Sequence, residues 1–196
     1  MISLSDLRQF KTNGRKFSCL TCYDASMAKA MELAEVDTIL IGDSLGMAIQ
    51  GRDSTLPVTV EDMAYHTAAV RRGNQHAFIM TDLPFMSYAT LNDALSSSKT
   101  VMQAGAQMVK MEGGAWLSET VTVLTRNGIP VCVHLGLTPQ SVHVFGGYKL
   151  QARTREAADQ LIADCKAVVE AGAALLLLEC VPAQLGKEIS ELFPHV

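Results

Sequence analysis

Short aliphatic runs alternate with longer segments of helical periodicity along most of the chain. The expected strands are Phe17–Tyr23, Thr38–Gly42, Ala77–Thr81, Met108–Met111, Val131–Leu135 and Leu175–Leu178. The expected helices are Ala25–Glu35, Val60–Arg72, Asn92–Ala104, Leu117–Asn127, Arg155–Ala171 and Ala183–Leu192. Strands that alternate with helices predict βαβ units and a parallel sheet, and apolar strands are typical of a sheet covered on both faces.

Residues typical of helix ends stand at the expected boundaries. Thr59 with Asp62, and Thr90 with Asp93, place a hydroxyl and a carboxylate three residues apart at a helix start. A glycine follows four of the helical segments, where a left-handed residue often ends a helix: Gly73, Gly105, Gly128 and Gly172.

Strand after strand finishes on a polar or ionisable residue. These residues are Asp24, Asp43, Asp82, Lys110 with Glu112, His134 and Glu179. In a (β/α)8 barrel the carboxyl ends of all strands share one rim, whereas an open doubly wound sheet concentrates such residues at one switch point. The spread over all strands favours the barrel, and neither a G-x-G-x-x-G nor a P-loop motif supports the alternative.

The pattern contains six βα units, and a seventh strand would begin near Val196. A closed barrel typically needs about 250 residues. We therefore expect residues 1–196 to form a single barrel domain whose C-terminal units are missing.

Composition narrows the functional class. The chain is 48% hydrophobic with a net charge of −4, and its basic residues form no stripe, so nucleic acid is not an expected partner. No apolar run approaches the roughly 18 residues of a membrane span, and the polar N-terminus does not resemble a secretory signal. We expect a cytoplasmic protein that does not associate with membranes.

Five cysteines, an odd number spread through apolar segments, indicate reduced thiols. Cys19 and Cys22 form a C-x-x-C that could be a redox or zinc pair. Because no second C-x-x-C or paired His follows, two strand residues that point to opposite faces are the favoured interpretation.

Three acids at strand ends predict a magnesium site. Asp43, Asp82 and Glu112 supply hard oxygen ligands, which Mg²⁺ combines with water and substrate oxygens. Each acid alone could cap a helix or stand in a solvated turn, and Asp24 is most simply a cap. Several carboxylates on one rim, with Lys110 among them, favour the metal site because a divalent cation removes their repulsion.

Three further residues carry candidate roles. Lys110 is costly to bury without a partner, which could be an anionic ligand or a neighbouring acid such as Glu112. His134 could donate to a substrate oxygen or be a hydrogen-bonded core histidine. Glu179 follows four leucines, where desolvation disfavours the charged carboxylate, as a general base for a C–H proton requires; an exposed strand-end Glu is the alternative.

These residue types together indicate a reaction class. Mg²⁺ can chelate an α-keto acid through its carboxylate and keto oxygens, a carboxylate base can remove the neighbouring proton, and the metal can stabilise the enolate.

Several ordered motifs resemble the ketopantoate hydroxymethyltransferase family, and the resemblance runs from Leu7 to Val196. The motifs are residues 42–47 (GDSLGM), 53–59 (DSTLPVT), 65–73 (YHTAAVRRG), 82–86 (DLPFM), 109–114 (VKMEGG), 134–140 (HLGLTPQ) and 145–149 (FGGYK).

The resemblance implies a (β/α)8 TIM barrel of the phosphoenolpyruvate/pyruvate type. It implies transfer of a hydroxymethyl group from 5,10-methylenetetrahydrofolate to α-ketoisovalerate, giving ketopantoate in pantothenate biosynthesis. The implied Mg²⁺ ligands are Asp43, Asp82 and Glu112; the implied substrate-binding residues are Asp43, Ser44, Asp82, Lys110 and His134; the implied base is Glu179. The family is a cytoplasmic homo-oligomer, commonly a decamer.

The chain departs from the family in two places. Where the family has Val-Gln-Gly-Arg, this sequence has Leu150-Gln151-Ala152-Arg153, and the family continues beyond Val196. Two alternatives therefore stand beside the transferase: another Mg²⁺-dependent α-keto-acid lyase or mutase on the same barrel, and an inactive fragment.

Overall fold

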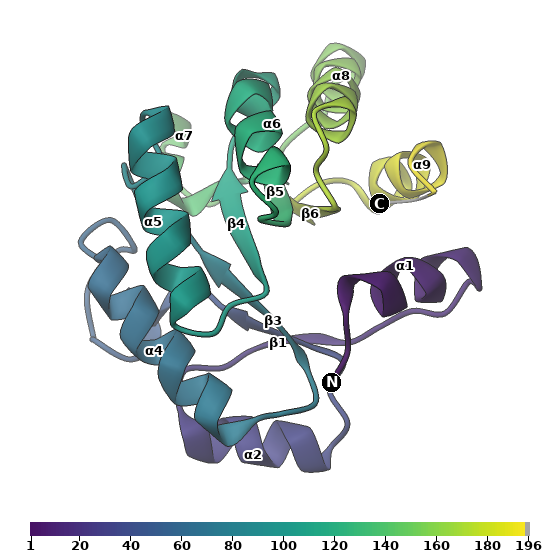
Figure 1. Cartoon of the computed structure of the whole chain (residues 1–196). Helices are drawn as coiled ribbons and strands as arrows, with labels where there is room; N and C mark the ends of the chain where they lie inside the picture. The colour runs from purple at the N-terminus through teal and green to yellow at the C-terminus, as the bar shows by residue number, and fades with distance from the viewer. Residues whose placement is uncertain (195–196) are drawn as a thin grey trace. The chain divides into compact units, whose positions relative to one another are not determined.

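Six parallel strands lie in a sheet in the order in which they occur along the chain (Figure 1). The computed structural model describes residues 1–194. The strands are β1 (Cys19–Thr21), β2 (Thr38–Ile41), β3 (Phe78–Asp82), β4 (Met108–Glu112), β5 (Val131–Gly136) and β6 (Leu175–Glu179). A doubly wound sheet reverses its strand order at a switch point, so this unbroken order is the order of a βα barrel. The predicted α/β class and all six strands are confirmed, and the boundaries of β2 to β6 differ from the prediction by at most one residue.

The chain forms two compact units, Met1–Lys110 and Met111–Val196, and β4 runs from the first into the second. The first unit contains α1 (Leu4–Thr12), α2 (Ala25–Leu33), α3 (Leu45–Ala48), α4 (Val60–Gly73) and α5 (Leu91–Gln103). In its sheet, Ile41 lies opposite Thr81 and Asp82 lies opposite Lys110. This register brings the carboxyl ends of β2, β3 and β4 to one edge.

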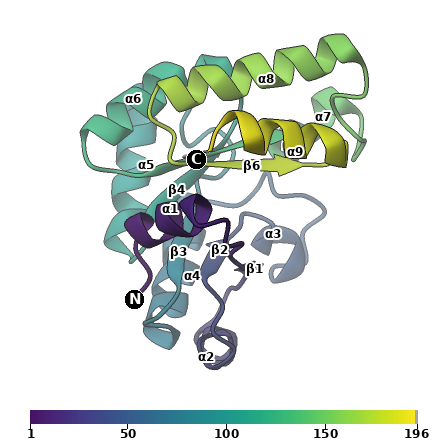
Figure 2. The same ribbon diagram turned by 90° about the vertical axis from the view of Figure 1, so that its right-hand side faces the viewer.

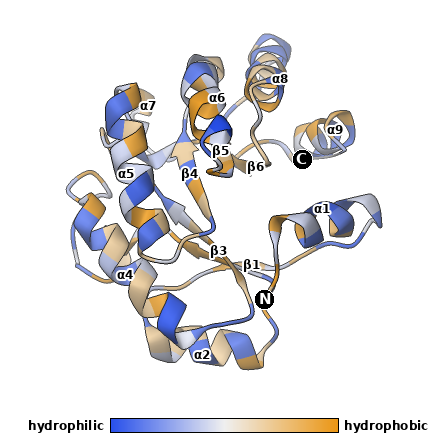
Figure 3. Ribbon diagram, in the orientation of Figure 1, coloured by the Kyte–Doolittle hydropathy of each residue, from blue (hydrophilic) through white to orange (hydrophobic). Residues whose placement is uncertain are grey.

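The core of the first unit lies on both faces of β3. All five residues of this strand are buried, and Phe78 and Ile79 are among the largest fully buried side chains. Figure 3 shows this strand as predominantly hydrophobic, whereas α4 and α5 carry both hydrophilic and hydrophobic residues. The expectation of strands covered on both faces is wrong for β1, whose three residues are all exposed, and the predicted seven-residue strand is correspondingly shorter.

Gly73 does not have the role that its position after a helix predicts. The other three glycines, Gly105, Gly128 and Gly172, have positive φ angles, but Gly73 is the last residue of α4. A Cβ at Gly73 would lie 2.2 Å from the carbonyl oxygen of Ala25, at the start of α2. Glycine is needed there because α2 and α4 pack at close range, and not because the backbone is left-handed.

Helix α1 was not predicted. Ser3 and Asp6 form a reciprocal capping box at its start, and only Leu7 of the helix is buried. The backbone of Ile2 donates to the carbonyl of His76 at 2.7 Å and accepts from the Gln107 side chain at 3.3 Å. His76 and Gln107 precede β3 and β4, so this segment lies at the amino ends of the strands, away from the predicted site.

The second unit contains β5, β6 and six helical segments. These are η1 (Ala115–Leu117), α6 (Ser118–Arg126), η2 (Pro139–Ser141), α7 (Val142–Phe145), α8 (Arg155–Glu170) and α9 (Ala183–Leu192). In this unit α8 contacts β5 and α9, and Figure 2 shows α8 and α9 running in similar directions. The register of β5 with β6 places His134 opposite Leu177 and Gly136 opposite Glu179. Within residues 1–194, no helix has the length and apolarity that a membrane span requires.

Candidate active site

The ends of β2 and β3 bring two acidic residues close together in the first unit. Asp43 directly follows β2 and Asp82 ends β3, and both are buried, at 3% relative exposure. The backbone N–H of Asp43 donates to Asp82 Oδ2 at 3.1 Å. A Cβ at Gly42 would lie 2.9 Å from Ser44 Oγ and 3.5 Å from Asp82 Oδ2, so the glycine leaves room for this approach.

Lys110 lies beside the same carboxylate. Its Nζ is 2.7 Å from Asp82 Oδ1, and both side chains are about 5% exposed or less. A buried ammonium requires a partner, and the register of β3 with β4 supplies one directly opposite. The sequence allowed either an anionic ligand or a neighbouring acid as the partner of Lys110. The structure shows an ion pair with a neighbouring acid, Asp82.

Ser44 is held by a residue that the sequence did not single out. Tyr23 Oη and Ser44 Oγ share a hydrogen bond of 2.8 Å, and His66 Nδ1 donates to the backbone carbonyl of Tyr23 at 2.6 Å. Tyr23 directly precedes Asp24, at the end of the first predicted strand. Its phenol is a polar group at the end of a predicted strand, and this position could have identified Tyr23 as a site residue. Asp24 itself accepts from the backbone of Met27 and caps α2, as predicted.

In the second unit, an imidazole lies between two carboxylates. His134 is 2% exposed; its Nδ1 is 3.4 Å from Glu112 Oε1 and its Nε2 is 3.3 Å from Glu179 Oε2. The three side chains come from β4, β5 and β6, in strand order. A row of carboxylate, imidazole and carboxylate can position a base and pass a proton.

Glu112 has a second contact that orients it. Its Oε2 accepts a 2.9 Å hydrogen bond from the backbone N–H of Gln140, in the turn η2. This contact could not be predicted from the sequence, because a backbone donor depends on the path of the loop and not on residue type. With one oxygen on Gln140 and the other near His134, the carboxylate has a fixed orientation.

Glu179 is less buried than its sequence neighbours predict. Its side chain is 40% exposed, and every residue of β6 has intermediate burial. Among residues 1–194, β6 pairs with β5 along one edge and no strand pairs with the other, so the leucines before Glu179 are only partly covered. The apolar enclosure expected around this carboxylate is therefore partial.

Gly136 lets the Glu179 backbone approach β5. Leu137 N donates to the Glu179 carbonyl at 2.9 Å, and a Cβ at Gly136 would lie 2.3 Å from that oxygen. Gly136 also has a φ of +88°. The position therefore excludes other residues for two independent reasons, conformation and space.

We expect G136A to destabilise the protein more than G128A. Gly128 has a φ of +80°, and no atom lies within 4 Å of a Cβ built there. G128A should therefore lower the free energy of unfolding only through the left-handed conformation, by about 1–2 kcal/mol. G136A adds a backbone clash, and overpacking costs roughly 1–3 kcal/mol more. Urea unfolding followed by circular dichroism measures both variants; equal losses would show that the Glu179 backbone moves freely.

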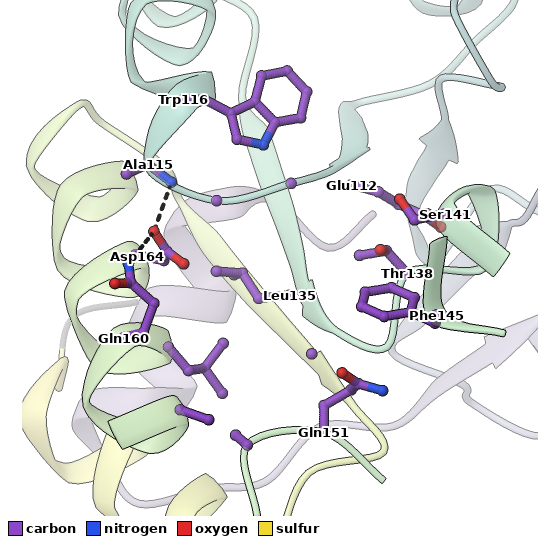
Figure 4. A pocket seen from close by; sticks show the side chains of 16 residues that line it. Glu112, Ala115, Trp116, Leu135, Thr138, Ser141, Phe145, Gln151, Gln160 and Asp164 are labelled. Carbon is purple, nitrogen blue, oxygen red and sulfur yellow. Dashed lines mark hydrogen bonds between the residues drawn. The ribbon is translucent and has the colours of Figure 1, made fainter. Parts of the chain in front are cut away.

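A cavity of about 490 Å³ lies next to Glu112 in the second unit (Figure 4). It is bordered by the turn after β4, the end of β5 and one side of α8. Ala152, in the loop that departs from the family pattern, lines it and has a φ of +52°. This left-handed conformation favours glycine, so the family's glycine at this position has a physical reason and alanine is strained there.

The five cysteines form no disulfide, and of the two in the C-x-x-C only Cys19 lies in β1. All five are free thiols; Cys22 is buried whereas Cys19 is exposed, as expected for opposite faces. Burial raises the pKa of Cys22 above its ordinary value and raises that of Cys165 to about 12. Both thiols therefore stay protonated near neutral pH.

The sequence matches the ketopantoate hydroxymethyltransferase family over residues 1–194. The chain belongs to this family. It is 91% identical to 3-methyl-2-oxobutanoate hydroxymethyltransferase of Acinetobacter baumannii (strain AYE) over 195 residues, which cover all of this chain and 72% of that protein.

Solved structures of other enzymes share the fold. The structure of 2,3-dimethylmalate lyase, a PEP mutase/isocitrate lyase superfamily member, matches 98% of this chain and 69% of its own, with a TM-score of 0.71 and 16% identity. Phosphonopyruvate hydrolase, in complex with oxalate and Mg²⁺, matches 91% of this chain and 63% of its own, with a TM-score of 0.70 and 14% identity. Identities this low show the fold alone, which is the barrel class predicted from the sequence.

Proposed function

We propose that this chain transfers a hydroxymethyl group from 5,10-methylenetetrahydrofolate to 3-methyl-2-oxobutanoate (α-ketoisovalerate), giving ketopantoate in pantothenate biosynthesis. Family membership supports the reaction, and the row Glu112–His134–Glu179 supports the chemistry. The reaction requires loss of the C3 proton of the keto acid before the new carbon–carbon bond forms. Glu179 is the proposed base, because its carboxylate is the partly exposed member of the row and can meet a substrate.

His134 and Lys110 are the proposed contacts for the keto acid. His134 Nε2, which faces Glu179, can donate to a substrate oxygen beside the carbon that loses its proton. The buried ammonium of Lys110 can neutralise the substrate carboxylate, with Ser44 as a hydroxyl donor held by Tyr23. These contacts orient C3 toward the base, so the proton moves to an oxygen of Glu179.

The donor set suits Mg²⁺. Among residues 1–194, no three His, Cys, Asp or Glu side chains are grouped as a ready-made metal cage. Mg²⁺ does not require one, since it binds through one or two carboxylates and keeps water and substrate oxygens. Asp43 and Asp82, buried at neighbouring strand ends, fit that requirement, and Glu112 follows Lys110 by two positions on β4 as the proposed third acid. When bound, the metal would supply the positive charge that stabilises an enolate.

Deuterium exchange tests the proton-transfer half of the reaction. We expect the C3 proton of α-ketoisovalerate to exchange in D₂O with this chain and Mg²⁺, without folate, and EDTA to stop the exchange. Proton NMR follows the C3 signal. Exchange that continues in EDTA would overturn the metal assignment. Absence of exchange, while the longer Acinetobacter relative exchanges under the same conditions, would instead support the inactive fragment.

The identity of the product separates the transferase from a related lyase or mutase. Addition of 5,10-methylenetetrahydrofolate to the same sample should convert α-ketoisovalerate to ketopantoate, with consumption of one water and release of one equivalent of tetrahydrofolate. Cleavage of a dicarboxylate without folate would favour the lyase. A homo-oligomeric state and a cytoplasmic location, both implied by the family resemblance, remain predictions.

A further inference from the structure

The cavity beside Glu112 has features that the keto-acid chemistry does not use. Its volume of about 490 Å³ is in the range of small-molecule sites, and all its lining residues belong to the second unit. The lining includes Trp116, Phe145, Gln151, Gln160 and Asp164, which have no role in proton abstraction. Figure 4 shows Gln160 and Asp164 on one side of the space and Phe145, Thr138 and Glu112 on the other, with Trp116 at the top of the view and Gln151 at the bottom.

Asp164, on α8, has one oxygen fixed and one available. Its Oδ1 accepts from the backbone N–H of Ala115 at 3.1 Å and from Gln160 Nε2 at 3.3 Å. Within the described part of the chain, no hydrogen bond is formed to Asp164 Oδ2. A Cβ at Gly114 would lie 3.0 Å from this Oδ2, so a side chain at position 114 would crowd the carboxylate.

Trp116 supplies a flat apolar surface at the same cavity. Its side chain is 65% exposed, which is unusual for so large an apolar group. A Cβ at Gly113 would lie 2.6 Å from Trp116 Cζ2, so the indole packs against bare backbone and its position is restricted. An exposed, restricted indole beside a cavity is suited to stacking on a planar ring.

The charge of the lining selects the ligand class. The sixteen lining residues include two acids, Glu112 and Asp164, and none of these described residues is Lys, Arg or His. A small anion such as the keto acid is repelled from such a site. A planar ring that carries neighbouring N–H donors is attracted, because a carboxylate accepts from both.

We propose that this cavity binds the pterin ring of the one-carbon donor, with Asp164 accepting from its ring N–H and amino group and Trp116 covering one face. This inference rests on the proposed function, which requires a tetrahydrofolate carrier. Glu112 and Gly136 line the cavity, and Gly136 packs against the Glu179 backbone. The cavity therefore adjoins the end of β5, beside the strand ends from which His134 and Glu179 come.

Fluorescence of Trp116 tests the assignment directly, because it is the only tryptophan in the chain. Titration with tetrahydrofolate should quench its emission in a saturable way, after correction with N-acetyltryptophanamide under the same additions. D164N should weaken binding about 10- to 100-fold, the effect of losing a hydrogen bond to a charged group. It keeps an oxygen for Ala115 N–H, so the fold is retained, as circular dichroism verifies.

Two further variants make the result specific. A157F should weaken quenching comparably, because Ala157 lines the cavity and a phenyl ring takes up part of its volume without changing the charge of the lining. D159N should titrate like the unmodified protein, because Asp159 stands on the same helix, 53% exposed and paired with Arg155.

Each outcome bears on one proposal. Saturable quenching that depends on Asp164 and Ala157 supports the pterin site, even where C3 exchange of the keto acid is absent and the proposed function fails. Conversely, C3 exchange with no quenching, or with quenching equal in D164N, A157F and D159N, overturns the pterin site and leaves the proposed proton abstraction intact.

Discussion

Replacement of Glu179 by glutamine should lower the rate of C3 proton exchange in α-ketoisovalerate by roughly 10²- to 10⁴-fold, the contribution of a general base. Glutamine keeps the size of the side chain and an oxygen near His134, but it is not a base that can take the C3 proton. The keto acid should still bind, since Lys110, Ser44 and His134 are unchanged. Proton NMR in D₂O gives the exchange rate, and calorimetric titration with α-ketoisovalerate and Mg²⁺ gives the affinity.

E170Q is the matched control. Glu170 ends α8 with its side chain 67% exposed, and its ion pair with Lys166 is a surface contact of little energetic weight. The same charge change there should leave the exchange rate unaltered. Full exchange in E179Q would show that another group removes the proton, and His134, 3.3 Å away, would be the next candidate.

The elements were predictable where buried apolar residues recur with a clear period. Strand β3 is buried throughout, and its sequence is apolar until Asp82, so both its place and its end could be recognised. Helix α1 has a single buried residue, Leu7, and therefore lacks the apolar stripe on which a helix prediction depends. The short helices α3 and α7 are four residues each, too short for any periodic signal.

The site was predictable to the extent that one rule determines it. Parallel strands end at a common edge, so an acid or base at a strand end belongs to the site; this rule gave the Asp43–Asp82 pair and the row of Glu112, His134 and Glu179. Contacts that depend on loop paths or on helix faces carry no such signal. The Gln140 backbone donor and the carboxylate of Asp164 became visible only with the fold.

Removal of the Lys110 ammonium should cost about 3–5 kcal/mol of unfolding free energy, the usual result of breaking a buried ion pair from one side. In K110M the Asp82 carboxylate remains at 3% exposure next to Asp43, with no ammonium 2.7 Å away. Urea unfolding followed by circular dichroism measures the loss. K99M, on the exposed side of α5, is the matched control and should change stability by less than about 0.5 kcal/mol.

The double variant D82N/K110M separates the missing ammonium from the lost packing. Because neither charge is then left alone, it should recover most of the stability that K110M loses. A double variant as unstable as K110M would mean that the lysine stem, and not its charge, stabilises the site.

Magnesium extends the same experiment to the proposed metal site. A ligand that binds the folded state alone stabilises it in proportion to the logarithm of its concentration over its Kd. In K110M, Asp43 and Asp82 repel each other without a cation, so millimolar Mg²⁺ should restore part of the lost stability. The same addition should do little for D82N/K110M, which lacks one of the two carboxylates. Equal responses of the two variants would place the metal elsewhere, whereas a response confined to K110M would assign Asp82 to it.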